Sequence, residues 1–245
     1  MEISTDPSYT GVIEDHPHAA AFTVLGYADG AVTLLAKDCF RGWYGQDVSE
    51  ENWTFHIGRG SQLGAGSTVR QAWSDHVLRI GNWTAIGQRC FFQLAGQHRM
   101  NTAAIADFAN TVWPRVKSLE AYPAIASTTI TVEHDVWIGD DAYFLPGCTI
   151  STGSVIGARS LVPMNLVTEP YGIYVGSPAR LVRFRFPAAV REALLDLAWW
   201  ELPVPWLAEH HELFMSDLAG DEVQALDTLA ALEEKKREWL AGSVA

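Results

Sequence analysis

Residues 132–162 read VEHDVWIGDDAYFLPGCTISTGSVIGARSLV, and an aliphatic or aromatic side chain returns at every sixth position of this stretch. The returning residues are Val132, Ile138, Phe144, Ile150, Ile156 and Val162. Mostly small residues recur four positions after them: Val136, Ala142, Cys148, Ser154 and Ser160. A period of six is neither the helical period of about 3.6 nor the strand period of about 2. The pattern therefore predicts short flat strands joined by corners, so that the chain coils around an axis and stacks on itself.

The same six-residue pattern occurs earlier, in residues 57–69 and again in residues 80–92. Ordinary strands separated by glycine turns would explain one such run, but repeated runs with the same spacing favour a stacked coil. We expect this coil to span residues 51–186, after a lead-in of short strands over residues 1–50. Residues 99–131 interrupt the period. Such a long departure from a rigid repeat is usually a lid or a binding loop.

Residues 187–245 lose the six-residue period and show helical patterns instead. Pro187 is placed to open a helix that runs to about Trp200, and a second helix is expected after Pro205. A third helix is expected from Asp221. Its apolar stripe consists of Val223, Leu226, Leu229 and Ala230. We expect this stripe to cover a surface either of this chain's coil or of a neighbouring copy.

The composition narrows the class of protein. The chain has 245 residues, of which 48% are hydrophobic and 19% charged, and its formal net charge is −12. This charge argues against nucleic acid or an anionic membrane as the main partner. We see neither a long uncharged apolar stretch nor a leader pattern, and we expect a soluble, cytoplasmic protein. The widely spaced cysteines are expected to be reduced packing residues: Cys39, Cys90 and Cys148.

Several motifs occur in an order that resembles a known family. They are GQHRM at 96–100, VWIG at 136–139, PG at 146–147, YVGSPAR at 174–180 and WWELP at 199–203. With the repeats, they resemble the hexapeptide acyltransferases and, within them, the xenobiotic branch with the type B chloramphenicol and streptogramin A acetyltransferases. The resemblance implies a left-handed parallel β-helix, an exception to the usual right-handed crossover. It also implies acetyl transfer from acetyl-coenzyme A to a hydroxyl of a small acceptor, in a homotrimer with active sites at subunit seams.

His98 is the candidate catalytic residue. An alcohol that attacks a thioester must lose its proton, and a neutral imidazole with an ordinary pKa of about 6.5 is suited to accept it. The alternative is a surface histidine at a corner of the coil. The flanking GQHRM motif favours the catalytic role, because the resemblance places the family's histidine there. The other seven histidines are expected to be structural or exposed.

A second set of residues is expected to bind the coenzyme. Trp137 offers an aromatic wall for the extended thiol arm, and the resemblance places this tryptophan near the coenzyme. Small residues leave backbone amides accessible, and basic residues suit the phosphates. The full set is Trp137, Gly139, Gly157, Ala158, Pro178, Arg180 and Arg183, with Arg185 in the same basic cluster. Corner packing explains the small residues equally well, and a solvated edge explains the arginines.

The acceptor is less well defined. In the xenobiotic branch an acidic residue commonly follows the His-Arg-Met run, but here Asn101 follows it. Asn101 carries no charge and can both donate and accept hydrogen bonds, so a cationic or antibiotic-like acceptor does not follow. Trp43 and Tyr44 are candidate walls of the acceptor pocket or, equally, core residues.

Three rival interpretations stay open at this point. A carbonic anhydrase of the γ type shares the coil but needs three histidine ligands for zinc, and the expected His-x4-His pair is absent, so no metal is expected. A non-catalytic scaffold would keep the coil without needing His98. An enzyme that uses another acyl donor or reaction would share the same seam.

Overall fold

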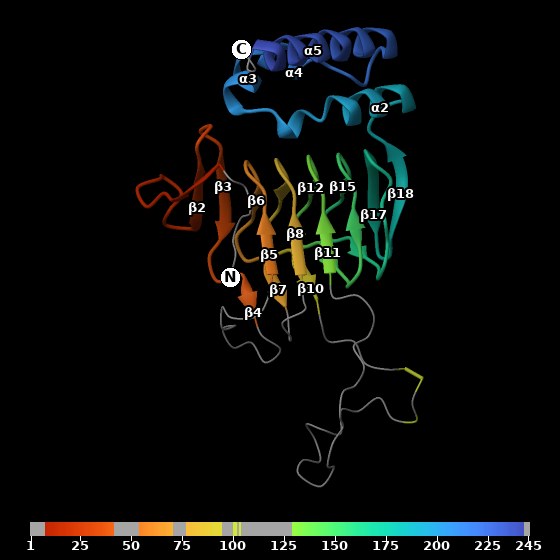
Figure 1. The fold of residues 1–245 in the computed structure, drawn as a ribbon. Helices are drawn as coiled ribbons and strands as arrows, with labels where there is room; N and C mark the ends of the chain where they lie inside the picture. The colour runs from red at the N-terminus through yellow and green to blue at the C-terminus, as the bar shows by residue number, and fades with distance from the viewer. Residues whose placement is uncertain are drawn as a thin grey trace.

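The computed structural model describes residues 8–41, 54–70, 77–94, 100, 101, 103 and 129–242. The described strands form three sheets that wrap around one axis, with helices along one side (Figure 1). Sheet A contains β1 (Tyr9–Val12), β2 (Phe22–Tyr27), β3 (Val32–Ala36), β6 (Gln62–Leu63), β9 (Ala85–Ile86), β12 (Trp137–Ile138), β15 (Val155–Ile156), β17 (Gly172–Gly176) and β18 (Ala179–Phe184). Sheet B contains β4 (Phe40–Arg41), β7 (Thr68–Arg70), β10 (Phe91–Gln93), β13 (Tyr143–Phe144) and β16 (Leu161–Val162). Sheet C contains β5 (Thr54–Ile57), β8 (Val77–Ile80), β11 (Thr129–Val132) and β14 (Thr149–Ile150).

Consecutive strands from β4 to β16 enter sheets B, C and A in rotation, and each pairs in parallel with the strand one turn away. The six-residue period arises because the returning apolar residue of every strand points to the axis. Ile138, Phe144, Ile150 and Ile156 are all fully buried. Phe92 and Phe144 stack in consecutive turns with ring centroids 4.7 Å apart. The predicted core is confirmed.

The parallel coil begins earlier than the boundary near residue 50 that the sequence predicts. β1, β2 and β3 form an antiparallel meander, but β3 also pairs in parallel with β6, and β4 pairs in parallel with β7. Leu35 is buried opposite Leu63, in the same inward position as the later repeats. A single pair of strands before the first repeat carries too little periodicity to reveal this turn.

Each turn of the coil has three corners, and each corner uses left-handed backbone. The covered corner, between sheets C and A, has this conformation at Gly60, Trp83, Asp135, Gly153 and Tyr171. The open corner, between sheets A and B, has it at Asp38, Gly66, Arg89, Asp141 and Arg159. The insertion corner, between sheets B and C, has it at Gly147 and Asn165. In the chain, residues 71–76 separate β7 from β8 and residues 94–128 separate β10 from β11.

Four α-helices and a 3-10 turn follow the coil among the described residues: α2 (Ala188–Leu197), η1 (Trp199–Glu201), α3 (Val204–Glu209), α4 (His211–Phe214) and α5 (Glu222–Gly242). We call residues 187–242 the helical segment, which lies along the covered corner (Figure 1). α2 ends at Leu197, short of the predicted Trp200, because Ala198 adopts left-handed φ of 44°. None of the described helices is long and apolar enough to cross a membrane.

The predicted stripe of the last helix is only partly correct. Leu229 is buried as expected, but the other buried residues of α5 are Ala225 and Leu232, and Val223 is 69% exposed. α5 packs against α2, and this contact buries the face that carries Ala225, Leu229 and Leu232. Its start is as predicted, because the Asp221 carboxylate accepts the Gln224 N–H at 3.0 Å.

A buried ion pair joins the helical segment to the coil. The Arg59 guanidinium, at the covered corner, contacts the Asp29 carboxylate at 2.5 Å. It also donates to the carbonyl oxygens of Trp200 at 3.2 Å and Leu202 at 2.9 Å. Asp29 in turn accepts the Val204 N–H at 3.2 Å. One network thus connects the β2–β3 turn, the first turn of the coil and the start of α3.

The three cysteines are free and buried, as expected for packing residues. Burial raises the pKa of the Cys90 thiol to about 11 and that of Cys148 to about 12. Both thiols are therefore protonated near neutral pH and are poor nucleophiles.

Candidate active site

On the outer face of sheet A, a row of mostly apolar side chains runs across the strands and ends at an arginine. The row consists of Ala85, Trp137, Val155, Ile173 and Arg183, which are register partners across β9, β12, β15, β17 and β18. Strand neighbours alternate in direction, so these side chains point outward while Ile138 and Ile156 fill the core. Trp137 is 60% exposed, which is unusual for a large aromatic side chain and leaves its ring free to contact a ligand.

A strip of glycines runs beside this row. Gly87, Gly139 and Gly157 occupy equivalent positions in consecutive turns, since each donates its N–H to the next turn. A Cβ added at Gly139 would lie 2.5 Å from the Ala158 nitrogen, so tight stacking of the turns requires this glycine. At Gly157 the obstacle at 2.8 Å is a side-chain atom of Val175. Packing between turns is therefore sufficient to require glycine at position 139. Because these glycines have no side chains, the backbone beside Trp137 is not covered by side chains of its own.

The basic cluster predicted at the end of the coil divides into two parts. Arg180 and Arg183 lie on the edge strand β18, donate to the neighbouring carbonyls of Ala179 and Phe184, and form no ion pair with any described carboxylate. Arg185 instead contacts the Asp135 carboxylate at 3.1 Å and the Gly153 carbonyl at 2.9 Å. Only the first two guanidinium groups are thus available to an anionic ligand.

The spacing of these features suits an extended ligand. Three inter-strand steps of about 4.8 Å separate β12 from β18, so the Trp137 and Arg183 backbones are roughly 14 Å apart. An apolar arm with amide groups could lie along the row and reach the two arginines with a phosphate. Two further predicted residues flank the same face. Pro178 lies in the turn between β17 and β18, after a cis peptide bond from Ser177, and Ala158 lies in the open corner.

The structure places the predicted coenzyme residues on sheet A or in the turns that border it, but it tests neither their role nor that of the other candidates. His98, Trp43 and Tyr44 lie outside the described residues. Asn101 is described and exposed, next to Met100, which is 89% exposed. The catalytic and acceptor assignments therefore stay predictions. Among the described residues, no three side chains of His, Cys, Asp or Glu gather closely enough to bind a metal ion.

His134 is the described histidine with the most defined environment, and its geometry argues against a role as base. Its Nδ1 accepts the Asn82 N–H at 3.0 Å, so in the neutral ring the proton resides on Nε2. Burial lowers the pKa of His134, although the nearby Glu201 and Glu133 oppose this effect. Neither ring nitrogen is free to take a proton from an acceptor without breaking this contact.

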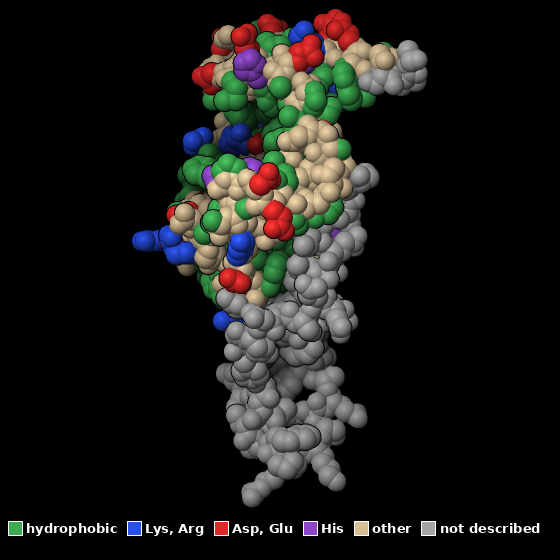
Figure 2. Space-filling model, turned by 90° about the vertical axis from the view of Figure 1, so that its left-hand side faces the viewer, with side chains coloured by type: hydrophobic (Ala, Val, Ile, Leu, Met, Phe, Trp, Pro, Cys, Tyr) green, Lys and Arg blue, Asp and Glu red, His purple; other side chains and the backbone are tan. Residues whose placement is uncertain are grey.

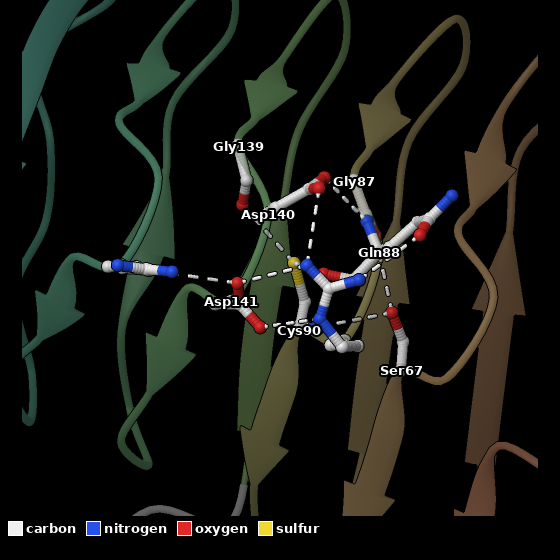
Figure 3. Close-up of polar contacts among 9 residues, drawn as sticks. Ser67, Gly87, Gln88, Cys90, Gly139, Asp140 and Asp141 are labelled. Atoms are coloured by element: carbon white, nitrogen blue, oxygen red, sulfur yellow. Dashed lines mark hydrogen bonds and ion pairs between the residues drawn. The ribbon is translucent and has the colours of Figure 1, made fainter.

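A charged cluster at the open corner was not anticipated from the sequence (Figure 3). The Arg89 guanidinium contacts both carboxylate oxygens of Asp141, at 2.8 and 3.0 Å, and lies 3.5 Å from Asp140. Arg159 approaches Asp141 from the next turn at 3.8 Å. The hydrogen bonds from Arg89 lower the pKa of Asp141. The only sequence signal is that Asp141 and Arg159 occupy the same repeat position three hexapeptides apart.

Comparisons with known proteins identify the family. A chloramphenicol acetyltransferase from Agrobacterium fabrum is 34% identical over 151 residues, which cover 61% of this chain and 69% of the relative. A probable macrolide acetyltransferase from Lysinibacillus sphaericus is 35% identical over 166 residues, which cover 66% and 83%. A chloramphenicol acetyltransferase from Escherichia coli is 38% identical over 136 residues, but the match spans only 63% of that relative's length. No family model matches the chain.

A solved hexapeptide-repeat acetyltransferase from Vibrio cholerae is 25% identical, with a TM-score of 0.41 over 60% of this chain and 68% of that one. The prediction of a mainly β, left-handed parallel β-helix with C-terminal helices is confirmed. The resemblance read from the motifs is confirmed by the relatives. The chain therefore belongs to the hexapeptide-repeat family of acetyltransferases that includes the chloramphenicol and macrolide acetyltransferases.

Proposed function

We propose that this protein transfers an acetyl group from acetyl-coenzyme A to a hydroxyl group of a small molecule. The observation that carries the proposal is the outer face of sheet A, where exposed Trp137 lies in register with Arg183. A glycine strip and a second arginine, Arg180, lie beside this row, and neither arginine pairs with a described carboxylate. Coenzyme A fits this arrangement, because its thiol arm is extended, contains amides and ends in phosphates, which suits an apolar wall followed by backbone groups and then cations. The names of the relatives support the same reaction class.

On this proposal each feature has its own part in binding the donor. The Trp137 ring packs against the thiol arm, whose amides form hydrogen bonds with backbone groups that neighbour Gly139 and Gly157, since the N–H groups of these two glycines already donate to the next turn. Arg180 and Arg183 bind the phosphates by charge-assisted hydrogen bonds. The low number of side chains on the glycine strip allows the arm to lie close to the sheet.

The chemical step uses His98 as general base. The imidazole takes the proton of the acceptor hydroxyl while its oxygen attacks the thioester carbonyl. The tetrahedral intermediate then expels the coenzyme thiolate, which receives the proton from the imidazolium. Backbone N–H groups are suited to stabilise the oxyanion in between. The products are an acetyl ester and free coenzyme A.

The acceptor and the assembly belong to the same proposal. The acceptor site is shaped by Asn101, Trp43, Tyr44 and the predicted loop, which must end at residue 128 and not at 131, because Thr129 already begins strand β11. Acceptors with hydroxyl groups comparable to chloramphenicol or a macrolide are the first to test. We propose a cytoplasmic homotrimer in which a second copy completes each site. The exposed apolar row on sheet A supports this arrangement, because it offers a surface for a neighbouring copy and the coenzyme together.

The base assignment is tested by turnover of His98→Ala, followed as thiol release with acetyl-coenzyme A and a panel of hydroxylated acceptors. We expect a loss of about 10² or more in turnover, which is the range for a general base, with coenzyme affinity unchanged. His18→Ala, at an exposed histidine of the lead-in, is the matched control and should keep full turnover. His98→Ala turnover equal to that of the wild type would contradict the assignment.

A further inference from the structure

The helical segment contacts the coil along the covered corner, and the space-filling view shows it as a layer above the coil with a recess between the two (Figure 2). We call this contact the helix–coil junction. It contains Trp83 against Trp199, with ring centroids 6.0 Å apart, and the Arg59–Asp29 network described above. A titratable side chain, His134, lies in the middle of it.

His134 holds both sides of the junction together. Its ring stacks on the Trp200 indole with centroids 5.5 Å apart and planes 11° apart. Its Nδ1 accepts the Asn82 N–H at 3.0 Å, and the Asn82 side-chain amide donates to the Trp200 carbonyl at 3.3 Å. Its Nε2 lies 4.0 Å from a carboxylate oxygen of Glu201. The neutral ring satisfies all of these contacts at once.

Protonation changes one contact directly. An imidazolium carries hydrogen on both ring nitrogens, so Nδ1 becomes a donor that faces another donor, the Asn82 N–H. The hydrogen bond is lost, and the ring must turn or the corner at Asn82 must move. Either adjustment disturbs the stack on Trp200. Glu201 opposes this effect by attracting the imidazolium from the other ring nitrogen.

Besides Glu201, the charged groups that adjoin His134 or belong to the Arg59 network have partners of their own. Glu133, next to His134, accepts hydrogen bonds from the Thr152 N–H at 2.8 Å and its hydroxyl at 3.0 Å. Asp135 is paired with Arg185 from the end of β18. Asp29 and Arg59 pair on the side of the first turn and the β2–β3 turn. Among these groups, His134 is the one whose ordinary pKa lies between about pH 5 and 8.

We propose that His134 is a pH-sensitive latch, and that its protonation releases the helical segment from the coil. Burial lowers the pKa of His134, with Glu201 and Glu133 opposing. A lowered pKa in the folded state means that the stabilisation is fully present above the unfolded value of about 6.5. It is lost as the pH falls from there through the folded value.

Two substitutions test the latch in opposite directions. His134→Asn keeps an acceptor near the position of Nδ1 but cannot be protonated, so stability should vary less with pH. Glu201→Gln removes the attraction for the imidazolium and should make the variation steeper. Melting temperatures are measured at pH 8.0 and 5.5. We expect the wild type to lose about 2–4 °C more than His134→Asn over this interval, which is a usual shift for a modest destabilisation in a domain of this size.

Hydrogen exchange locates the effect. On lowering the pH, after correction for intrinsic rates, wild-type α2 and α5 should lose protection while β11, β12 and β15 keep it. The loss in α2 and α5 should be absent in His134→Asn. Equal pH dependence in the wild type and His134→Asn would overturn the proposal. Loss of protection in the coil and the helices together would also overturn it, because the helical segment would then not be released by itself.

Discussion

Two corners of the same coil hold an aspartate in the same backbone conformation, and the two carboxylates behave in opposite ways. Asp135 at the covered corner has φ of 52°, and Asp141 at the open corner has φ of 60°. Each is bonded to an arginine, Arg185 and Arg89 respectively. Yet the pKa of Asp135 is raised, chiefly by burial, whereas that of Asp141 is lowered, chiefly by hydrogen bonds from Arg89.

The difference lies in what covers each corner. Desolvation is the largest effect on Asp135 and outweighs its arginine, whereas at Asp141 the hydrogen bonds from Arg89 outweigh desolvation, although both side chains are partly exposed. The repeat therefore sets the backbone of a corner but not its chemistry. The chemistry of these two corners depends on their surroundings, since the covered corner lies beneath the helical segment and the open corner does not.

Breaking the ion pair at each corner should give the largest contrast. Arg185→Met leaves the partly buried Asp135 carboxylate without its partner, and we expect the free energy of unfolding to fall by about 2–4 kcal/mol, somewhat less than for a fully buried pair. Arg89→Met, the matched change at the open corner, should leave the urea midpoint nearly unchanged, because Asp141 stays hydrated. Urea unfolding followed by circular dichroism measures both. Asp135→Asn added to Arg185→Met should restore part of the loss, and failure to do so would mean that the unpaired charge is not its cause.

Glycines in the left-handed position of each corner give a smaller contrast. Gly153 has φ of 72°, and an added Cβ would meet the Tyr171 ring at 2.3 Å. Gly66 has φ of 75°, but its nearest atom is Cγ of the flexible Arg89 side chain at 3.2 Å. We expect Gly153→Ala to cost about 2–4 kcal/mol from strain plus overpacking, and Gly66→Ala about 1 kcal/mol from strain alone. Equal losses in thermal unfolding would show that strain dominates at both corners.

The sequence was sufficient for the coil because the six-residue period is repeated and each returning side chain, from Ile138 to Ile156, is buried. It was not sufficient for the first turn, where β3 and β4 precede any repeat. It also did not reveal which residues other than glycine take left-handed corners, since Trp83 and Arg159 share no side-chain chemistry. Those positions follow from the register of the turns.

The same limit applies to the candidate site. The sequence shows one cluster of three arginines, Arg180, Arg183 and Arg185. The structure distinguishes Arg185, because its guanidinium pairs with Asp135, which lies fifty residues earlier and could not be identified as its partner from the sequence. The outward position of Trp137 could be predicted, because the alternation of its strand places it opposite the buried Ile138, while its contact with the coenzyme stays a prediction. His98, Trp43 and Tyr44 stay predictions, since they lie outside the described residues.

The central claim, a coenzyme-binding face on sheet A, is tested most directly by titration calorimetry of acetyl-coenzyme A. The account predicts micromolar, saturable binding at one site per chain in the wild type. It predicts at least a tenfold weaker affinity in Arg180→Ala/Arg183→Ala, because the phosphates lose both cations. Arg79→Ala, at an exposed arginine on sheet C, should bind as the wild type does. No binding to the wild type at millimolar coenzyme, or equal affinity in the double variant, would contradict the claim.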